Sequence, residues 1–527
     1  MNWEYIIIGA GSAGCALAHE LAKSNGNRIL VLEAGGSDRA LSIKVPAGVM
    51  RACSKYDWGY QANPDPSRNG AVEHWLRGRV LGGCSSINGT IYVRGSVHDF
   101  ERWSSLCNHR GNWSAREITA IFQEMECSDQ PGPLRGRGGP LHVRTVKRPH
   151  DVTRAFLESA GAAGYPFNED YNGPSQEGMS YIQLTQRRGL RWSAADAFLR
   201  PTLRQGRVRL LLDALAERIE VRGGRATSVT YSRHGRQYRE EAGDIILCAG
   251  AINTPKLLML SGIGDAHELA RHNIGVILDV PEVGRNLKDH PLVRMTYRMN
   301  VPTNNPTGGI LQKARMAAEF LLNGEGPISN IFESMGFVKS SPAKRLPDLQ
   351  LFFVTVGYMN TPGKGWRLAP YPAVMVYAAY SYPSSSGHVR LSNAQPEAPP
   401  VIEYGLFDKE ADLAAMMDGV RTIRRIMSTH PIRQMVEEEV IPGTGIADQA
   451  ALEHFVRHNS NICYHSIGTC RMGTDQDAVV GPDLRVRGTT NLWIADASVM
   501  PETISANLNG PCMMIGAKLG KQLNARG

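Results

Sequence analysis

The sequence of 527 residues lacks most of the features that mark specialised classes of protein. Its nine cysteines are an odd, dispersed set without a Cys-x-x-Cys pair, which disfavours zinc ligation and favours reduced thiols in a cytoplasmic compartment. The N-terminus has neither the basic segment nor the long apolar segment of a signal peptide, so we do not expect secretion. Internal repeats and low-complexity tracts are also missing.

Long charged and long apolar runs are absent too. The net charge of +8 comes from arginines and lysines that never form a run of five, and there is no nucleic-acid-binding motif, so we predict no nucleic-acid partner. The longest uncharged stretch, residues 368–388, contains three prolines and several tyrosines, which favours buried strands over a membrane helix. We therefore predict no integral membrane segment and leave peripheral attachment open.

The composition that remains is that of a globular protein, with 42% apolar residues and 55 glycines. Its length indicates roughly three structural units, or two large interleaved ones. A strand at residues 5–8, a helical stretch at 13–21 and a strand at 28–32 form a βαβ unit. Further strands and a final helix are expected at residues 208–212, 227–231, 244–248, 492–495 and 511–523.

Other segments differ in composition and in the spacing of their apolar residues. Residues 57–110 are rich in Gly, Pro, Asn and Trp and predict a long covering loop, whereas residues 111–165 have the spacing of helices. The runs 349–356 and 373–380, with a helical run at 409–427, predict a second domain that contains an antiparallel sheet.

The first βαβ unit carries a glycine-rich turn. Residues 9–14 read Gly-Ala-Gly-Ser-Ala-Gly between strand and helix, and Glu33 follows Gly14 by 19 residues at the end of the next strand. Gly9 permits the tight turn, and Gly11 lets backbone N–H groups approach a pyrophosphate. The Glu33 carboxylate would accept a hydrogen bond from a ribose hydroxyl and would repel a 2′-phosphate. The turn therefore predicts dinucleotide binding, with NAD and FAD both open.

The chain resembles the glucose-methanol-choline (GMC) oxidoreductase family in blocks spread along its whole length, at residues 77–89, 250–264, 283–290 and 494–501. The resemblance implies FAD as cofactor and oxidation of CH–OH donors. Some members carry a histidine covalently joined to the flavin where this chain reads Ser-Ile-Asn at residues 86–88, so we expect non-covalent FAD. The expected cofactor-binding residues are Gly9, Gly11, Ser12, Ala13, Gly14, Glu33, Ala34, Arg79, Gly82, Gly83, Ser85, Asn88, Gly89, Thr90, Ala216, Tyr464, Asp496, Ala497, Asn509 and Pro511.

Together these features predict an α/β protein in which a Rossmann-like FAD-binding domain is interleaved with an α+β substrate domain built on an antiparallel sheet. The FAD-binding domain is expected at residues 1–150, with its flavin-covering loop at 57–110, and at 201–290 and 461–527. The substrate domain is expected at residues 151–200 and 291–460.

The catalytic block lies near the C-terminus. Residues 464–473 read Tyr-His-Ser-Ile-Gly-Thr-Cys-Arg-Met-Gly, and Asn509 follows His465 by 44 residues. Alcohol oxidation requires loss of a hydroxyl proton, which an imidazole suits, so His465 is the expected base. By resemblance to the family's His-Asn pair, Asn509 would bind the substrate oxygen while hydride passes to flavin N5. Other histidines, including His290, are interpreted as structural.

The substrate itself is less well defined. Tyr358, Trp366, Tyr377, Phe332 and Glu333 are candidates for a wall over the flavin. We expect oxidation of a primary, neutral or aromatic alcohol to an aldehyde, with oxygen or a quinone or other carrier as electron acceptor. The alternatives are a choline-type cationic alcohol, which Glu333 could bind, and a hydroxynitrile lyase-like activity on the same fold.

Overall fold

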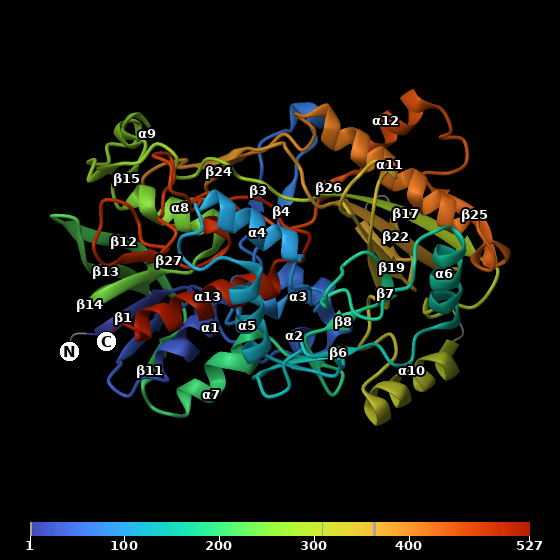
Figure 1. The fold of residues 1–527 in the computed structure, drawn as a ribbon, viewed down its shortest axis with the longest axis horizontal. Coiled ribbons are helices and arrows are strands. Elements are labelled where there is room, and N and C mark those ends of the chain that lie inside the picture. The colour runs from blue at the N-terminus through green and yellow to red at the C-terminus, as the bar shows by residue number, and fades with distance from the viewer. Residues whose placement is uncertain (1–2, 308, 362–364, 527) are drawn as a thin grey trace.

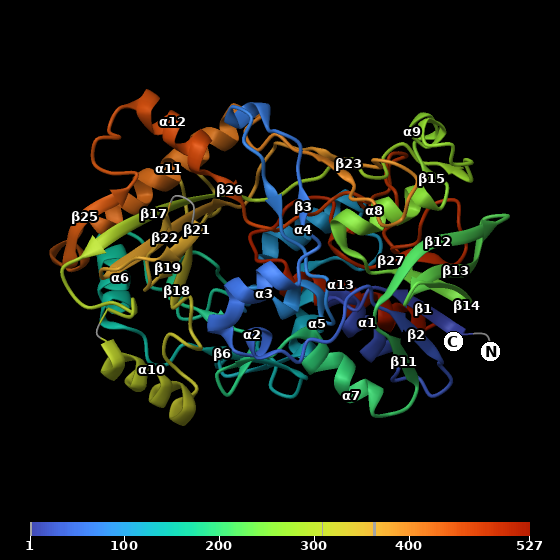
Figure 2. The ribbon, with the colours of Figure 1, turned by 180° about the vertical axis from the view of Figure 1, so that it is seen from behind.

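Two β-sheets at opposite sides of the molecule organise the chain (Figure 1). The structure is a computed structural model that describes residues 3–307, 309–361 and 365–526. A seven-stranded sheet lies on the side that holds both chain termini, and a six-stranded sheet lies on the other side (Figures 1 and 2). Among the helices in these ranges, none is long and apolar enough to cross a membrane.

The seven-stranded sheet is assembled from three separate stretches of chain. Its order is β11-β2-β1-β14-β13-β12, with β27 also paired to β14. The apolar strands β1, β2, β11 and β27 run parallel to the end of β14, as expected for strands covered on both faces. The strands are β1 (Trp3–Ile8), β2 (Ile29–Leu32), β11 (Val208–Leu211), β12 (Ala214–Arg222), β13 (Arg225–Arg233), β14 (Arg236–Leu247) and β27 (Leu492–Ile494).

Helix α1 (Ser12–Leu21) follows β1 directly and packs along the C-terminal helix α13 (Asn509–Asn524). The two helices approach closely because α13 carries Gly516, where a Cβ atom would lie 2.2 Å from the carbonyl oxygen of Ala13. This contact brings the start of α13 to the glycine-rich turn.

The six-stranded sheet is antiparallel, in the order β18-β19-β22-β17-β25, with β26 also paired to β17. Helix α11 (Glu410–Met427) packs against β22 and β17. The strands are β17 (Pro291–Met299), β18 (Ser334–Val338), β19 (Leu349–Val354), β22 (Ala373–Tyr380), β25 (Val436–Ile441) and β26 (Asn461–Ile462). All but β26 fall within the segments expected for the substrate domain, whose boundaries stay a prediction.

Two expectations about local structure were wrong. The expected loop 57–110 contains helix α4 (Val97–Leu106), because Ser96 and Asp99 cap its N-terminus reciprocally. The expected helical stretch 111–165 contains two helices, α5 (Ala115–Met125) and α6 (Asp151–Ala162), separated by strands β5 (Glu126–Ser128) and β6 (Leu141–Thr145). Two prolines and four glycines between residues 131 and 139 prevent a continuous helix there.

The remaining helices are α2 (Leu41–Lys44), α3 (Val49–Lys55), α7 (Arg200–Leu203), α8 (Gly250–Leu260), α9 (Ala266–Arg271), α10 (Gly309–Asn323) and α12 (Gln449–Asn459). The remaining strands are β3 (Tyr60–Gln61), β4 (His74–Trp75), β7 (Gly178–Tyr181), β8 (Gln183–Leu184), β9 (Gln186–Arg187), β10 (Leu190–Arg191), β15 (Ile263–Gly264), β16 (Leu278–Asp279), β20 (Tyr358–Thr361), β21 (Gly365–Leu368), β23 (His388–Arg390) and β24 (Val401–Glu403).

Candidate active site

A cavity of about 930 Å³ receives residues from both sheets. Its size suits a cofactor together with a small substrate. Most of the predicted site residues line it: Gly9, Gly11, Ser12, Ala13, Glu33, Ala34, Gly83, Asn88, Gly89, Ala216, Tyr464, His465, Asp496, Ala497 and Asn509. The predicted residues that are not among its lining residues are Gly14, Arg79, Gly82, Ser85, Thr90 and Pro511.

The glycine-rich turn fits a dinucleotide pyrophosphate. Gly9 has φ +106°, and a Cβ atom there would lie 2.4 Å from the carbonyl oxygen of Cys248. A Cβ atom at Gly11 would meet only the Cα atom of Gly83, at 4.0 Å, so the backbone is open towards the cavity. Gly11 also precedes the first residue of α1, where free N–H groups and the helix dipole favour an anion.

Glu33 lies at the end of β2, buried at the wall of the same cavity. Its carboxylate accepts hydrogen bonds from the backbone N–H groups of Ala10 (2.9 Å) and Gly35 (2.7 Å). Burial raises the pKa of Glu33 to about 7, although these two hydrogen bonds oppose the shift. Each carboxylate oxygen has a second lone pair, so the group retains the capacity to accept from a ribose hydroxyl.

Several predicted residues shape the loop at 82–90 instead of lining the cavity. Gly82 has φ +88°, which requires glycine, and the Ser85 hydroxyl donates to its carbonyl group at 2.6 Å. The Arg79 guanidinium stacks on the Trp58 ring, with 4.6 Å between its central carbon and the ring centroid. Thr90 is buried and accepts a hydrogen bond from Gln186. Their expected contact with the cofactor stays a prediction.

His465 is buried at the cavity wall between two side chains that sequence analysis did not assign to it. Its Nδ1 atom lies 3.0 Å from Nδ1 of His290, and its Nε2 atom lies 3.2 Å from Nδ2 of Asn507. Asn507 also accepts a hydrogen bond from Gln350 through Oδ1, at 2.9 Å. The amide is thus oriented with its NH₂ group towards His465.

These contacts assign a tautomer to His465. The Asn507 amide donates to Nε2, so Nε2 is unprotonated, and the proton of the neutral ring lies on Nδ1, which donates to His290. Burial, the adjacent His290 ring and the Arg77 guanidinium hold the pKa of His465 well below its usual range. Burial likewise lowers the pKa of His290 to about 4. Both rings are neutral near pH 7, and Nε2 is ready to accept a proton.

Asn509 does not contact His465 in the structure. It is the first residue of α13, and its Oδ1 atom accepts a hydrogen bond from the Ser12 hydroxyl at 2.8 Å. The asparagine two residues earlier, Asn507, is the one that faces the imidazole. The expected pairing of His465 with Asn509 is therefore corrected: Asn509 joins the cofactor turn, because its side chain points to the start of α1.

The backbone of His465 is fixed by Asp289. One carboxylate oxygen accepts from the His465 N–H group and the other from the Ser466 hydroxyl, both at 2.8 Å. Burial raises the pKa of Asp289 to about 6, while the Arg77 guanidinium opposes the shift. Since Asp289 directly precedes His290, one turn positions both neighbours of the base. In the sequence, this turn belongs to the block at residues 283–290, which includes His290, the histidine interpreted as structural.

The substrate end of the cavity is a wall of aromatic and apolar side chains. Phe332, Tyr358 and Tyr377 line it, as predicted. Glu333 is not among the lining residues. It is buried and accepts hydrogen bonds from Thr153 (2.6 Å) and from the backbone of His150 (2.8 Å). Burial raises the pKa of Glu333 to about 7. Trp366 lies outside the residues whose side chains are described.

Three neighbouring strands present alternate residues to this end of the cavity. They are Leu292 and Arg294 of β17, Phe352 and Val354 of β19, and Met375 and Tyr377 of β22. Arg294 pairs across the sheet with Tyr377, which pairs in turn with Phe352. Of these six residues, Arg294 alone is charged, and no motif marked it in the sequence.

The parallel sheet with its glycine-rich turn, and a histidine in the same cavity, define a dinucleotide-dependent oxidoreductase. Residues 3–292 and 383–516 match the N-terminal and C-terminal GMC oxidoreductase family profiles. The chain belongs to the GMC oxidoreductase family. This confirms the expected family, the α/β fold class and the class of FAD-dependent oxidoreductases that act on alcohols.

Similar proteins cover the whole chain. It is 38% identical to an oxygen-dependent choline dehydrogenase of Rhizobium etli, over all of this chain and 97% of that protein. The crystal structure of pyridoxine 4-oxidase from Mesorbium loti superposes with a TM-score of 0.90 at 28% identity, covering 99% of both chains. A fungal aryl-alcohol oxidase shares the fold, with a TM-score of 0.85 at 21% identity, covering 100% of this chain and 99% of that one.

Proposed function

We propose that this protein oxidises a primary alcohol, neutral or aromatic, to an aldehyde, with His465 as the base. The observation that carries the proposal is the contact of His465 Nε2 with the Asn507 amide, 3.2 Å away, inside the cavity that contains the dinucleotide turn. Bound FAD supplies the hydride acceptor. Nε2 accepts the hydroxyl proton, the Asn507 amide binds the alcohol oxygen, and the buried surroundings exclude water.

FAD held without a covalent link is supported by residues 86–88, which read Ser-Ile-Asn and supply no histidine. The backbone at Gly11 faces the pyrophosphate position, Glu33 faces the ribose position, and Asn509 holds Ser12 beside the turn. Acid precipitation of the purified protein tests this: a non-covalent flavin stays in the supernatant, whereas a covalent one sediments with the chain. The cytoplasmic location expected from the dispersed cysteines belongs to the same proposal.

A choline-type substrate is the second candidate, because a choline dehydrogenase is among the relatives. The cavity argues against it. Glu333, the acid expected to bind the cation, is turned away into a network with His150 and Thr153. Arg294 lines the wall instead, and a guanidinium cation repels a quaternary ammonium group. We therefore rank benzyl-type alcohols above choline.

Anaerobic mixing tests the proposed function. Benzyl alcohol should bleach the flavin absorbance near about 450 nm, a generic flavin property, and choline should not. A hydroxynitrile lyase-like enzyme would cleave mandelonitrile without bleaching, which would contradict the proposal. Repeating the turnover in air, with peroxide and dye reduction measured in parallel, then identifies oxygen or another carrier as the acceptor.

A further inference from the structure

Arg294 has no part in the proton transfer, yet it lines the substrate end of the cavity. Whatever other contacts it makes, its cationic guanidinium acts on any group that enters the cavity. It shares a row of the sheet with Tyr377 and Phe352, whose rings form the surrounding wall. A fixed cation in an aromatic wall is the arrangement that recognises a carboxylate on an aromatic ring.

The spacing along β17 sets the length of such a substrate. His290, in contact with His465, directly precedes the strand, and Arg294 lies four residues further on. Four residues of extended strand span about 13 Å, and the long arginine side chain shortens the gap. Leu292 lines the cavity between the two. The interval suits one aromatic ring between the hydroxymethyl group and the anion.

We propose that the substrate is a hydroxymethyl-arene carboxylate, with Arg294 as the residue that binds its carboxylate. This rests on the proposed alcohol oxidation and names its substrate class. The charge-assisted hydrogen bonds of an arginine–carboxylate pair strengthen binding by about 10- to 100-fold. Arg294 thus determines specificity while His465 removes the hydroxyl proton at the other end of the ring.

The test compares 4-(hydroxymethyl)benzoate with its uncharged analogue 4-methylbenzyl alcohol in the FAD-loaded enzyme. We expect kcat/KM to favour the carboxylate at least tenfold, Arg294→Met to abolish the preference, and Arg294→Lys to keep part of it. Benzoate, followed by its perturbation of the flavin spectrum, should bind at least tenfold more weakly to Arg294→Met. Equal benzoate affinities, or no preference in an enzyme that oxidises both alcohols, would overturn the proposal. Failure of every alcohol to reduce the flavin, with benzoate binding intact, would refute only the proposed function.

A second feature, independent of the cavity, is the outward face of helix α10. The helix stands at the rim of the molecule below α6 in Figure 1 and at the same rim from behind in Figure 2. Its apolar side chains at Ile310, Leu311, Leu321 and Leu322 are 83%, 81%, 78% and 82% exposed. These positions repeat at helical spacing and form one face. The helix therefore presents its apolar side to solvent.

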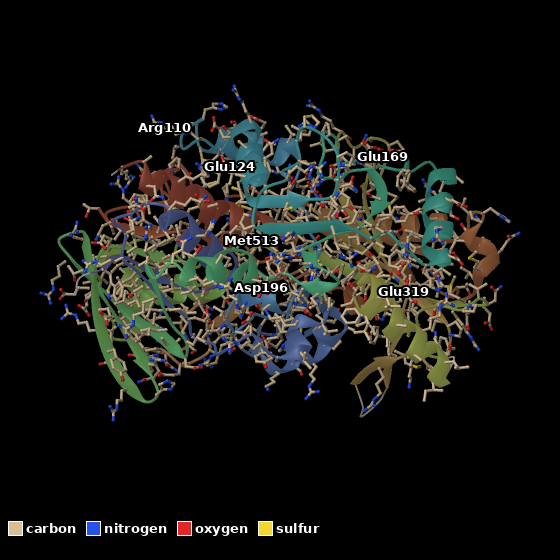
Figure 3. The ribbon with its side chains drawn as sticks, turned by 90° about the horizontal axis from the view of Figure 1, so that it is seen from below. Arg110, Glu124, Glu169, Asp196, Glu319 and Met513 are labelled. Atoms are coloured by element: carbon tan, nitrogen blue, oxygen red, sulfur yellow. The ribbon has the colours of Figure 1, made fainter. Side chains whose placement is uncertain are left out.

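The side of α10 that faces the protein carries polar as well as apolar residues, since Gln312, Met316, Glu319 and Phe320 are all partly buried. The Gln312 amide donates to the backbone carbonyl groups of Thr303 and Asn305, at 3.4 and 3.1 Å. Glu319, which is labelled in Figure 3, is turned towards the chain that follows the helix, since a Cβ atom at Gly326 would lie 3.0 Å from its carboxylate. A surface helix usually buries its large apolar side chains, so four of them exposed on one face of α10 indicate a surface for a partner.

Basic residues border this face. Lys313 and Arg315 are exposed, and at 100° per residue they fall on its two edges. The β9–β10 hairpin packs against the end of the helix, with a Cβ atom at Gly189 only 2.6 Å from Gly324, and it carries the exposed Arg187 and Arg188. An apolar face with cationic edges matches an anionic lipid surface. A second copy of the chain would bring like charges together on a twofold axis.

We propose that α10 docks the enzyme on anionic phospholipid membranes. The holoenzyme should co-sediment with phosphatidylglycerol-containing vesicles and not with pure phosphatidylcholine vesicles, and added salt should release it. Two double variants, Leu321→Gln/Leu322→Gln and Lys313→Gln/Arg315→Gln, should each weaken binding at least tenfold. For the second variant, the reason is that each cation near such a surface strengthens binding about fivefold. The control Val276→Gln, at an exposed apolar residue elsewhere, should bind like the unaltered protein. Absence of binding, or a dimer that Leu321→Gln/Leu322→Gln dissociates, would overturn the proposal.

Discussion

The two asparagines near the start of α13 provide a sharp test of the site, because only one of them contacts the base. Asn507→Ala removes the donor 3.2 Å from Nε2 of His465 and leaves the buried Gln350 amide without its acceptor. Loss of a buried hydrogen bond lowers the free energy of unfolding by about 1 kcal/mol, and the amide left unsatisfied lowers it by about 1–3 kcal/mol. Loss of an oriented donor to the alcohol oxygen raises the activation free energy of the reaction by about 3 kcal/mol. We expect kcat/KM to fall by about 100-fold or more.

Asn509→Ala is the matched control, since it removes a side chain of the same type from the same segment. Its partner is the Ser12 hydroxyl at the cofactor turn, so FAD affinity should fall by about tenfold while kcat at saturating FAD changes less than about threefold. The assay is steady-state turnover of benzyl alcohol, with FAD titrated separately. An equal loss of kcat for Asn509→Ala in the FAD-saturated enzyme would refute the assignment of roles.

Three further predictions concern pH and packing. Because burial holds the pKa of His465 low, kcat/KM should stay flat between pH 8 and pH 6, and a fall centred on the ordinary histidine pKa would contradict the neutral pair. Burial raises the pKa of Glu333 from 4.5 to about 7, so its contribution to stability is full below pH 4.5 and is lost as pH rises through 7. Between pH 5 and 8 the free energy of unfolding should therefore decrease by up to about 3 kcal/mol in the unaltered protein. Glu333→Gln should remove this decrease, as measured by urea denaturation. Gly516→Ala should lower stability by about 1–3 kcal/mol in thermal unfolding, because its Cβ atom would lie 2.2 Å from the Ala13 carbonyl oxygen. The control Gly161→Ala in α6, which has open space around it, should be neutral or stabilising.

The cofactor end of the site was largely predictable because backbone geometry restricts its sequence. Only glycine fits the positive φ and close approach at Gly9, so the motif itself carries the structure of the turn. The order of strand, turn and helix, with Glu33 at the end of β2, follows from the same short-range pattern. Such features depend on residues that are close together in the sequence, so the sequence alone predicts them.

The catalytic end was less predictable because its contacts are long-range. Asn507 and Asn509 occur in one short motif, and counting residues does not reveal which side chain faces His465; that depends on where α13 begins and on its packing against α1. The role of His290 depends on the turn before β17, which brings it to a residue 175 positions away. Arg294 faces the cavity because of its strand register, which is set by pairing with β22.

Removal of the hydroxyl proton by His465 is the central step of the proposed reaction. Anaerobic stopped-flow mixing of the FAD-loaded protein with benzyl alcohol measures that step without an electron acceptor. We predict that His465→Ala slows bleaching of the flavin by at least about 100-fold, as expected for loss of a general base, while the bound FAD content stays unchanged. Bleaching of His465→Ala at the rate of the unaltered protein would contradict the role of His465 as the base.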